Sequence, residues 1–515
     1  MTVTGSAETT EAQPVSTLIP ARVDRMRWSR FHTRMVVALG VAWILDGLEI
    51  TVASDVADIL EKKNTLAMSA RAVGDIASVY LIGEVVGALV FGRLSDKLGR
   101  RRLFLVTLGV YLIGSGLTAA TFGHDTGWVI WLYATRFVAG MGIGGEYAAI
   151  NSAIDEMIPA HYRGRVDIAI NGTYWGGALL GTLAELVILN HLSDTVSWRI
   201  GFLLGPVLAI AVIYVRRNLP ESPRWLVMHG RAAEAEAAMA QMEAESGERR
   251  ELPPLDESKA ILLNPITDMG YVALTRVLFR QMPRRSILSA SLMITQSFLY
   301  NAIFFTYALV LGTVYHVRSG SIPLYFIAFA IGNLAGPLLL GRLFDTIGRR
   351  VMISSTYLLS GVLLSLTAWA FDAKLLGALS QTIAWSVIFF FASAGASAAY
   401  LTVSEIFPLE VRAKAIAVFF AIAQAFGALG PDIYGSLVNS HRGLFIAYLI
   451  GGAVMLLGGV AELVFGVAAE RRSLEDIATP MSAVVSLGGG VVAGARTGFA
   501  RGSAPEYLYP PNHKP

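Results

Sequence analysis

Long apolar stretches separated by short polar segments make up most of the chain. A helix that crosses a membrane needs about 20 mostly apolar residues. Stretches of this length lie near residues 33–55, 72–94, 103–123, 127–150, 166–190 and 199–216, and then near 286–314, 322–343, 351–371, 375–402, 413–438 and 443–468. The pattern predicts an all-α membrane protein with twelve transmembrane helices in two groups of six.

The polar segments divide the chain into five parts. We expect a cytosolic N-terminal segment (1–30), a six-helix bundle (31–217), a cytosolic loop with short helices (218–285), a second six-helix bundle (286–470) and a disordered cytosolic tail (471–515). The loop contains an Ala-, Glu- and Arg-rich run that is typical of an amphipathic helix. The tail is rich in Gly, Ser and Pro, a composition that buries too little apolar surface to fold.

The composition supports a membrane protein. Hydrophobic residues make up 54% of the 515 residues and charged residues only 15%, whereas about a quarter of the residues in a soluble protein are charged. The absence of cysteine from the sequence excludes disulfides, thiolate metal sites and cysteine nucleophiles. With a net charge of only +3 and basic residues in short clusters, we expect no nucleic-acid partner.

The basic residues also predict the orientation of the chain. They concentrate before span 1 and between spans 2 and 3, 4 and 5, 8 and 9, and 10 and 11: Arg22, Arg25, Arg27, Arg30, Arg93, Lys97, Arg100, Arg101, Arg102, Arg163, Arg165, Arg342, Arg349, Arg350, Arg412 and Lys414. Cytoplasmic loops carry such an excess of Lys and Arg. Lys62, Lys63 and Arg71, after span 1, are exceptions. The distribution predicts a multi-pass protein of the cell membrane with both termini in the cytoplasm.

The two groups of spans share a repeated sequence. The segment Gly92–Arg101, with the pattern G-R-L-x-D-x-x-G-R-R, recurs at Gly341–Arg350. A second pattern, E-x-x-P-x-x-x-R, runs from Glu156 to Arg163 and recurs from Glu405 to Arg412. Both pairs are 249 residues apart. A duplication therefore predicts two pseudo-symmetric six-helix bundles, an arrangement that many secondary transporters use to build a cavity between the repeats.

These motifs resemble those of a known family. The repeated G-x-L-x-D-x-x-G-R-R pattern is similar to the signature of the major facilitator superfamily. The segments 136–146 and P-E-S-P-R-W at 220–225 resemble those of its sugar-porter and metabolite (aromatic acid) proton-symporter branches. The resemblance covers residues 30–470, and it implies a transporter with the major facilitator fold.

The loops between paired spans provide candidate gating residues. Asp96 can complement a helix N-terminus, Gly99 allows a tight turn, and Arg100 and Arg101 can pair with carboxylates of neighbouring helix ends. The resemblance implies that such networks latch a cytoplasmic gate. The expected gating residues are Gly92, Asp96, Gly99, Arg100, Arg101, Glu156, Arg163, Glu221, Arg224, Gly341, Asp345, Gly348, Arg349, Arg350, Glu405 and Arg412.

Ionisable residues within the spans are candidates for proton coupling. Asp46 and Glu49 lie about halfway along span 1, where a charge costs roughly 2.5–3.5 kcal/mol. Their spacing puts them on one face of the helix, and two neighbouring carboxyl groups favour retention of a proton. The segment is similar to the D-G-x-D pattern of aromatic-acid symporters. In span 4, Arg136 and Glu146 offer a further arginine and carboxylate, and an arginine–carboxylate pair can hold one acid ionised. The resemblance to sugar symporters implies that the acid at Glu49 is paired with Arg136.

Polar residues in other spans are candidate contacts to the solute. Gln296 and Asn301 resemble the Gln-Gln-x-x-x-x-Asn of sugar porters, with Thr295 at the first position. Tyr400 stands where sugar porters carry tryptophan, and these two departures count against a hexose. Amide side chains both donate and accept hydrogen bonds. We expect solute contacts from Gln296, Asn301, Tyr400, Asn171 and Trp175.

The sequence lacks the motifs of enzymes. Its glycine-rich segment 140–145 follows a membrane span instead of a strand, so it is no dinucleotide loop, and there is no Gly-Lys-Ser/Thr phosphate loop. The eight histidines contain no metal-type pair. We therefore expect no catalytic site, no metal and no cofactor, with a proton gradient as the driving force.

Together these features predict a proton-coupled symporter of a small polar organic solute, either an organic or aromatic acid or a related metabolite. The partners are then the solute and the lipid bilayer, and we expect a functional monomer. A sugar or polyol symporter is the first alternative. Drug efflux by proton antiport is the second, although residues 171–185 lack the proline of that branch's antiporter motif. A non-transporting membrane sensor is the third.

Overall fold

The computed structural model describes residues 15–481 except 190, 217–218, 248–250, 264–268, 319–320 and 439, together with 485–487 and 490–492. The predicted tail from residue 493 onward lies outside the described residues. The same holds for the side chain of Asp96.

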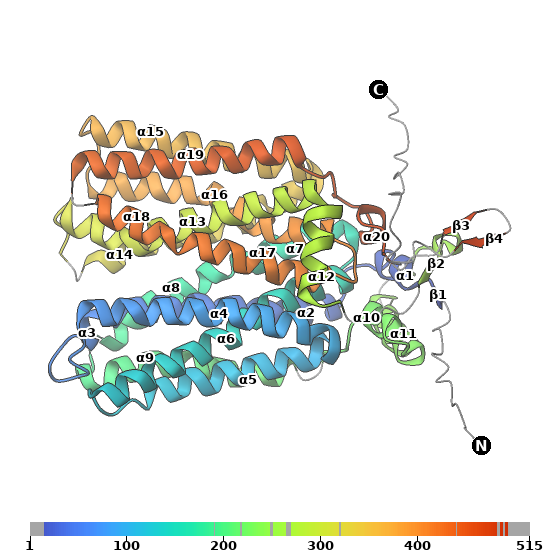
Figure 1. The fold of residues 1–515 in the computed structure, drawn as a ribbon, viewed down its shortest axis with the longest axis horizontal. Coiled ribbons are helices and arrows are strands. Elements are labelled where there is room, and N and C mark those ends of the chain that lie inside the picture. Colours follow the sequence, from blue (N-terminus) through green and yellow to red (C-terminus); the bar gives the residue numbers. More distant parts are fainter. Residues whose placement is uncertain are drawn as a thin grey trace, which may run out of the picture.

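Long helices form two bundles that lie side by side (Figure 1). The N-terminal bundle consists of α2 (Arg30–Asp55), α4 (Ala70–Leu98), α5 (Arg100–Ala119), α6 (Thr126–Met157), α7 (Ala160–Gly172), α8 (Tyr174–Ala184) and α9 (Asp194–Arg216), with the short α3 (Ala57–Leu60) and the π-helical turn η1 (Glu185–Leu189) at its ends. The C-terminal bundle consists of α13 (Pro283–Thr313), α14 (Ile322–Thr346), α15 (Arg349–Asp372), α16 (Ala378–Ile406), α17 (Arg412–Gly427), α18 (Leu429–Leu437) and α19 (His441–Phe465). Two groups of spans are therefore present, as the apolar pattern predicts.

Within the described residues, ten helical segments are long and apolar enough to cross a membrane. The predicted spans 4 and 5 correspond to α6 and to α7 with α8. The helix α6 carries buried charged residues, including Arg136 and Glu146, and α7 begins with a polar turn. Both lie against helices of the other bundle, α6 and α7 against α16 and α7 also against α14. Arg136 and Glu146 are themselves buried, so they face protein instead of lipid, which membrane helices tolerate.

Short elements gather beyond one end of the bundles, which we call the α10–α11 end (Figure 1). The loop between the bundles forms α10 (Pro223–Met228), α11 (Ala232–Gly247), the 3-10 turn η2 (Glu257–Lys259), α12 (Tyr271–Arg276) and the π-helical turn η3 (Val277–Gln281). Its strand β2 (Ile261–Leu263) pairs antiparallel with β1 (Val15–Thr17), which α1 (Ile19–Asp24) follows. Arg22 and Arg25 bind Glu243 on α11. Partial burial acts to raise the pKa of Glu243, but the hydrogen bonds from these arginines hold it below its usual value.

The C-terminal tail is ordered further than the composition predicts. Residues Leu474–Ile477 form the short helix α20, with both terminal side chains buried, and Val485–Leu487 pairs with Gly490–Val492 as strands β3 and β4. The expectation of disorder from residue 471 is therefore wrong for these residues. The tail as a whole has a polar, Gly- and Ser-rich composition, but it contains a few apolar side chains that pack on the bundles.

The repeated motif turns the chain between paired helices in the same way in each bundle. Gly99 separates α4 from α5 with φ 84°, and Gly348 separates α14 from α15 with φ 119°. Residues with a side chain rarely adopt this backbone conformation. The glycine of the motif is therefore required by the turn that it forms.

Close helix packing gives a first testable prediction. Gly177 on α8 lies against the backbone of α2, and a methyl group there would overlap the carbonyl oxygen of Ile44. A methyl group at the adjacent Gly176 would have no neighbour within 4 Å. We expect Gly177→Ala to lower the free energy of unfolding by about 1–3 kcal/mol, and Gly176→Ala to leave it unchanged. Thermal unfolding of both variants in detergent tests this, and equal melting temperatures would contradict the close packing.

Candidate functional site

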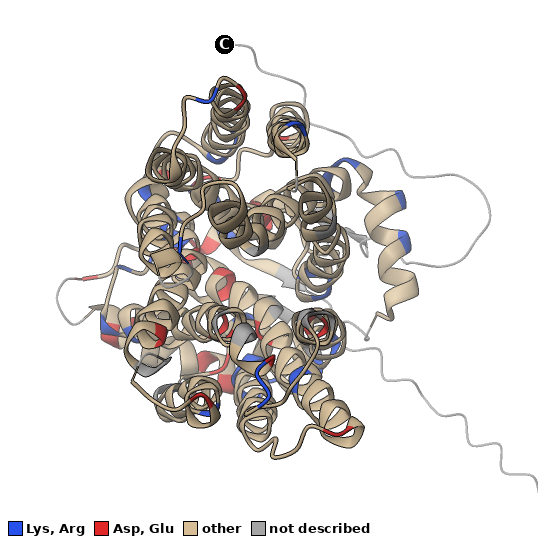
Figure 2. Cartoon of the chain, turned by 90° about the vertical axis from the view of Figure 1, so that its left-hand side faces the viewer, with Lys and Arg blue, Asp and Glu red and all other residues tan. Residues whose placement is uncertain are grey.

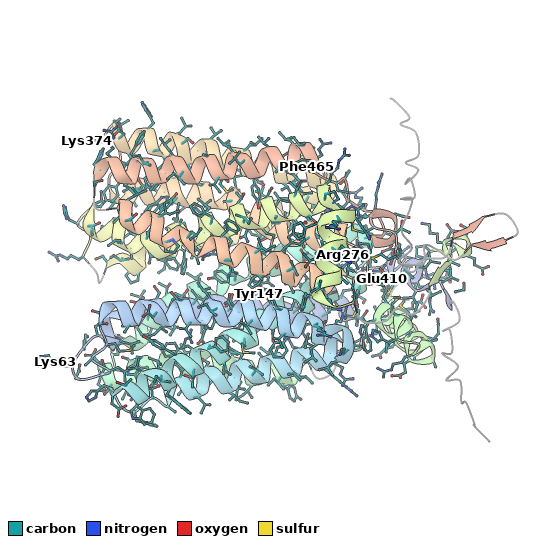
Figure 3. The ribbon with its side chains drawn as sticks, in the orientation of Figure 1. Lys63, Tyr147, Arg276, Lys374, Glu410 and Phe465 are labelled. Carbon is teal, nitrogen blue, oxygen red and sulfur yellow. The ribbon has the colours of Figure 1, made fainter. Side chains whose placement is uncertain are left out.

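A cavity lies between the two bundles. Helices α2, α4, α6, α7 and α8 form one wall, and α13, α16 and α17 form the other. Its empty volume is about 800 Å³, including space open toward solvent. Tyr147, one of the lining residues, lies at the boundary between the bundles (Figure 3). A lining of apolar and aromatic side chains with a few polar groups is typical of small-molecule sites.

All five residues expected to contact the solute line this cavity. They come from both bundles: Asn171, Trp175, Gln296, Asn301 and Tyr400. Asn171 donates to the backbone oxygen of Asp167 at 2.9 Å. The structure thus brings the five side chains to one place, and their contact with a solute stays a prediction.

A chain of polar side chains joins the two walls. Asn301 donates to Ser297 Oγ at 3.4 Å, and Ser297 donates to Gln424 Oε1 at 2.8 Å. Gln424 on α17 then donates through Nε2 to Glu84 Oε2 on α4 at 3.1 Å. This last hydrogen bond crosses from one bundle to the other, so the cavity wall is also a contact between the two bundles.

Aromatic rings make up much of the remaining wall. The ring of Trp43 lies 4.5 Å from that of Tyr147 and 5.2 Å from that of Tyr400, measured between centroids. Trp175 lies 5.6 Å from Tyr300. Rings of one bundle therefore contact rings of the other, and they offer aromatic faces on which a planar solute can stack.

The two acids of span 1 have different surroundings. Asp46 lines the cavity and accepts hydrogen bonds from Tyr80 at 3.1 Å and from Tyr147. Glu49 is not among the cavity-lining residues. It forms a buried ion pair with Arg136 and accepts hydrogen bonds from Tyr111 and Ser115, each at 2.8 Å. Its charge is therefore compensated, whereas no Lys or Arg among the described residues forms an ion pair with Asp46.

Glu146 does not join the cavity or pair with Arg136. It binds Arg216 at the end of α9, with Nη1 3.0 Å from Oε1, and Thr107 lies 3.3 Å away. Ten residues of α-helix rise about 15 Å, so Arg136 and Glu146 are too far apart on α6 to meet. The sequence analysis overlooked Arg216. Its position at the end of a span, next to the polar loop, gave no sign of a buried partner.

Glu84 is a further site residue that the sequence analysis missed. It lies within a predicted span, which by itself marks an ionisable residue as a functional candidate. Its side chain is buried, lines the cavity and accepts from Gln424. Its position within a predicted span was therefore the same indication of function as for Asp46, but Glu84 belongs to no motif of the resemblance.

The repeated motifs form ion pairs at the α10–α11 end. In the N-terminal bundle Arg100 binds Glu156 at 2.7 Å. Glu221 accepts hydrogen bonds from the backbone nitrogens of Arg100 at 2.8 Å and Arg101 at 3.2 Å. The expected pairing of Arg101 with Glu221 thus runs through the backbone of Arg101. These contacts tie α5 to the end of α6 and to the loop after α9.

The second copy forms the matching contacts and also reaches across to the first bundle. Arg349 binds Glu405 through two hydrogen bonds of 3.0 Å and Asp345 at 2.6 Å. Arg163 of the N-terminal bundle lies 3.5 Å from Glu405. The backbone nitrogen of Arg165 donates to Asp345 at 2.8 Å. Both bundles are therefore joined at this end, where the sequence predicts a gate.

The remaining predicted gate residues have separate partners. Arg224 binds Glu475 of α20 at 3.3 Å. Arg412 donates to the backbone oxygen of Phe407 at 3.2 Å, and Arg350 donates to that of Leu463. The glycines Gly92 and Gly341 lie within the helices α4 and α14. Glu475 and Arg165 were not predicted, because they lie outside the repeated motif.

Comparison with known proteins places the chain among transporters. Residues 46–480 match the model of a family described as "Sugar (and other) transporter". The chain is 25% identical to the niacin transporter NiaP of Acinetobacter baylyi over 89% of this chain and 99% of that protein. It is 26% identical to the inner membrane metabolite transport protein YdjE of Escherichia coli, over 89% and 98%. The solved proton:xylose symporter XylE, at 20% identity and a TM-score of 0.72 over 87% of this chain and 98% of that one, has the same fold.

Proposed function

The chain belongs to the sugar (and other) transporter family, and from this membership we propose that it is a proton-coupled symporter of a small polar organic solute. Family membership makes the protein a transporter of small molecules and not an enzyme, and its membrane helices require lipid surroundings in a cell membrane. The proposed mechanism is alternating access, in which the two bundles rock around a site near the middle of the membrane. The proton gradient is the driving force, and no cofactor takes part.

One observation carries this proposal. A solute-sized cavity with a buried carboxyl group, Asp46, in its wall lies between two bundles that ion pairs join at one end. A site that is closed toward one side of the membrane is what alternating access requires. A carboxyl group inside the site can bind a proton when the solute binds. One proton moving down 100 mV supplies about 2.3 kcal/mol, enough for roughly 50-fold accumulation of a neutral solute.

Asp46 is the better candidate for the proton site. Glu49 forms an ion pair with Arg136 and two further hydrogen bonds, so its negative charge is already stabilised. The hydroxyl groups of Tyr80 and Tyr147 around Asp46 carry no charge. Neutralising Asp46 therefore leaves no buried cation without a partner. Arg136 then serves to hold Glu49 instead of meeting an anionic solute.

For the solute, we propose an organic or aromatic acid or a related metabolite. The aromatic rings and amide groups of the cavity suit a planar ring with polar substituents. The similar protein of Acinetobacter baylyi is a niacin transporter, and niacin is such a compound. The likeness to a xylose symporter keeps a sugar or polyol as the second candidate. We further propose a monomer with both termini in the cytoplasm.

Uptake into proteoliposomes tests the coupling. We expect the wild type to accumulate one solute of a labelled panel of aromatic acids, other organic acids and sugars only when the outside is acidic. Asp46→Asn should equilibrate this solute without accumulating it, because a neutral amide cannot bind and release the proton. Asp194→Asn is the matched control, since this aspartate pairs with Lys62 on the surface, and we expect it to behave as the wild type.

Two results would contradict the proposal. Gradient-driven accumulation by Asp46→Asn would remove Asp46 from the coupling mechanism. Extrusion of lipophilic cations without uptake of any panel solute would favour drug efflux by antiport.

A further inference from the structure

The charged groups in the cavity wall are all acidic. Of its described lining residues, Asp46 and Glu84 carry carboxyl groups, and none is Lys, Arg or His. Figure 2, which looks along the helices, shows acidic positions among them near the centre of the view. Arg136 acts on Glu84 through its charge, but it is bound to Glu49 and stacked on the ring of Tyr80. The wall therefore contains two carboxyl groups and no basic group of its own.

Glu84 has an incomplete set of hydrogen bonds. Gln424 occupies Oε2, whereas no N–H group or hydroxyl of the described residues donates to Oε1, and the neighbouring group with which Glu84 interacts is the carboxyl group of Asp46. Only 1% of the residue is exposed. A buried carboxylate oxygen without a donor is unfavourable, and a donor group that arrives with a ligand removes this cost. Because Glu84 lines the cavity, that donor can come from a bound solute.

Aromatic rings surround the same space. Trp43, Tyr147, Tyr400 and Phe420 line the cavity and contact one another, with centroid distances of 4.5 Å from Trp43 to Tyr147 and 4.6 Å from Tyr147 to Phe420. The face of an aromatic ring carries negative electrostatic potential and attracts cations. Rings and carboxyl groups together form a site that stabilises positive charge.

We propose that the solute presents a cationic nitrogen to Glu84, carried on or next to a planar ring that lies against the faces of these aromatic side chains. This inference rests on the proposed transport function and specifies the substrate class of the same cavity. Among the solutes proposed above, this selects a related metabolite that carries a cationic nitrogen over an organic or aromatic acid. An anion would enter next to two acidic groups without a basic side chain to offset its charge.

Binding to the purified full-length protein tests the inference independently of transport. Three ligands share one pyridine ring and differ in charge at pH 7: N-methylnicotinamide is a cation, nicotinamide is neutral and nicotinate is an anion. Titration calorimetry in lipid nanodiscs measures their dissociation constants. We expect the cation to bind at least roughly tenfold more tightly than the anion, with the neutral ligand between them.

Two variants test whether Glu84 causes the preference for the cationic ligand. Glu84→Gln keeps the shape and the hydrogen bond with Gln424 but removes the charge, and we expect it to lose the preference for the cation while binding nicotinamide within about threefold of wild type. Glu462→Gln is the control. Glu462 is also a buried carboxyl group, both of whose oxygens lack partners among the described residues, but it does not line the cavity. This variant should keep the wild-type order of ligands.

The inference is overturned if nicotinate binds as tightly as the cation, if Glu84→Gln keeps the wild-type order, or if xylose binds and no pyridine does. Gradient-driven accumulation of nicotinate or xylose would in those cases still support the proposed symport. Conversely, cation binding that depends on Glu84, without gradient-driven accumulation of the bound ligand, would support the inference and contradict proton coupling.

Discussion

Replacing Glu49 with glutamine is expected to lower the free energy of unfolding by about 3–5 kcal/mol, the usual cost of breaking a buried ion pair from one side. The variant leaves the guanidinium of Arg136 charged and buried, with 1% of the residue exposed. Arginine does not lose its proton in proteins, so the charge cannot be relieved. The stability of the variant and of the wild type is compared by measuring the loss of monodisperse protein when each is heated in detergent.

The double variant Glu49→Gln with Arg136→Gln is the control for this expectation. It removes both charges, and we expect it to be more stable than the single variant because no unpaired ion remains. A single variant as stable as wild type, or a double variant less stable than the single one, would show that the ion pair is not what stabilises this region.

Replacing Glu405 with glutamine is expected to open the α10–α11 end. Glu405 holds Arg349 of its own bundle and lies 3.5 Å from Arg163 of the other. Without its charge, the contact between the bundles weakens and the state with this end open gains population. Coupling free energies between two sites of a protein typically change an equilibrium by roughly 5–150-fold, and we expect the ratio of the open to the closed state to change within this range.

The distance between two spin labels measures the opening. The sequence contains no cysteine, so cysteines placed at the exposed Arg102 and Thr346, one in each bundle, are the only labelling sites. We expect a longer distance to become populated in Glu405→Gln. Glu234→Gln removes an exposed ion pair with Arg231 on α11, and surface pairs contribute little, so this control should keep the wild-type distances. Unchanged distances in both variants would contradict a gating role for Glu405.

Some features of the site followed from the sequence because they depend on one helix or on the repeat. The residues Asn171, Trp175, Gln296, Asn301 and Tyr400 all line the cavity as expected. Spans are visible as apolar stretches, and the duplicated motif identifies equivalent loops. Position along a span then predicts depth in the membrane, which is why residues from several helices could be expected in one central cavity.

Partner choice between helices was not predictable in this way. Glu146 pairs with Arg216, a combination that nothing in the sequence suggested. The pairing of Glu49 with Arg136 is the one that the resemblance to sugar symporters implies. Glu84 was missed because it belongs to no motif of the resemblance, and its partner Gln424 lies 340 residues further along the chain, across the bundle interface.

The sequence by itself therefore determined the membrane class, the two bundles and the loops that join them, because apolar length and the repeat are local properties of the chain. Only the tertiary structure decided which acids are ion-paired and which line the cavity. A carboxyl group changes its role with the charge and hydrogen bonds of its neighbours, and in this protein those neighbours belong to other helices. The rotation and packing of the helices place Asp46 and Glu84 at the cavity and Glu49 against Arg136.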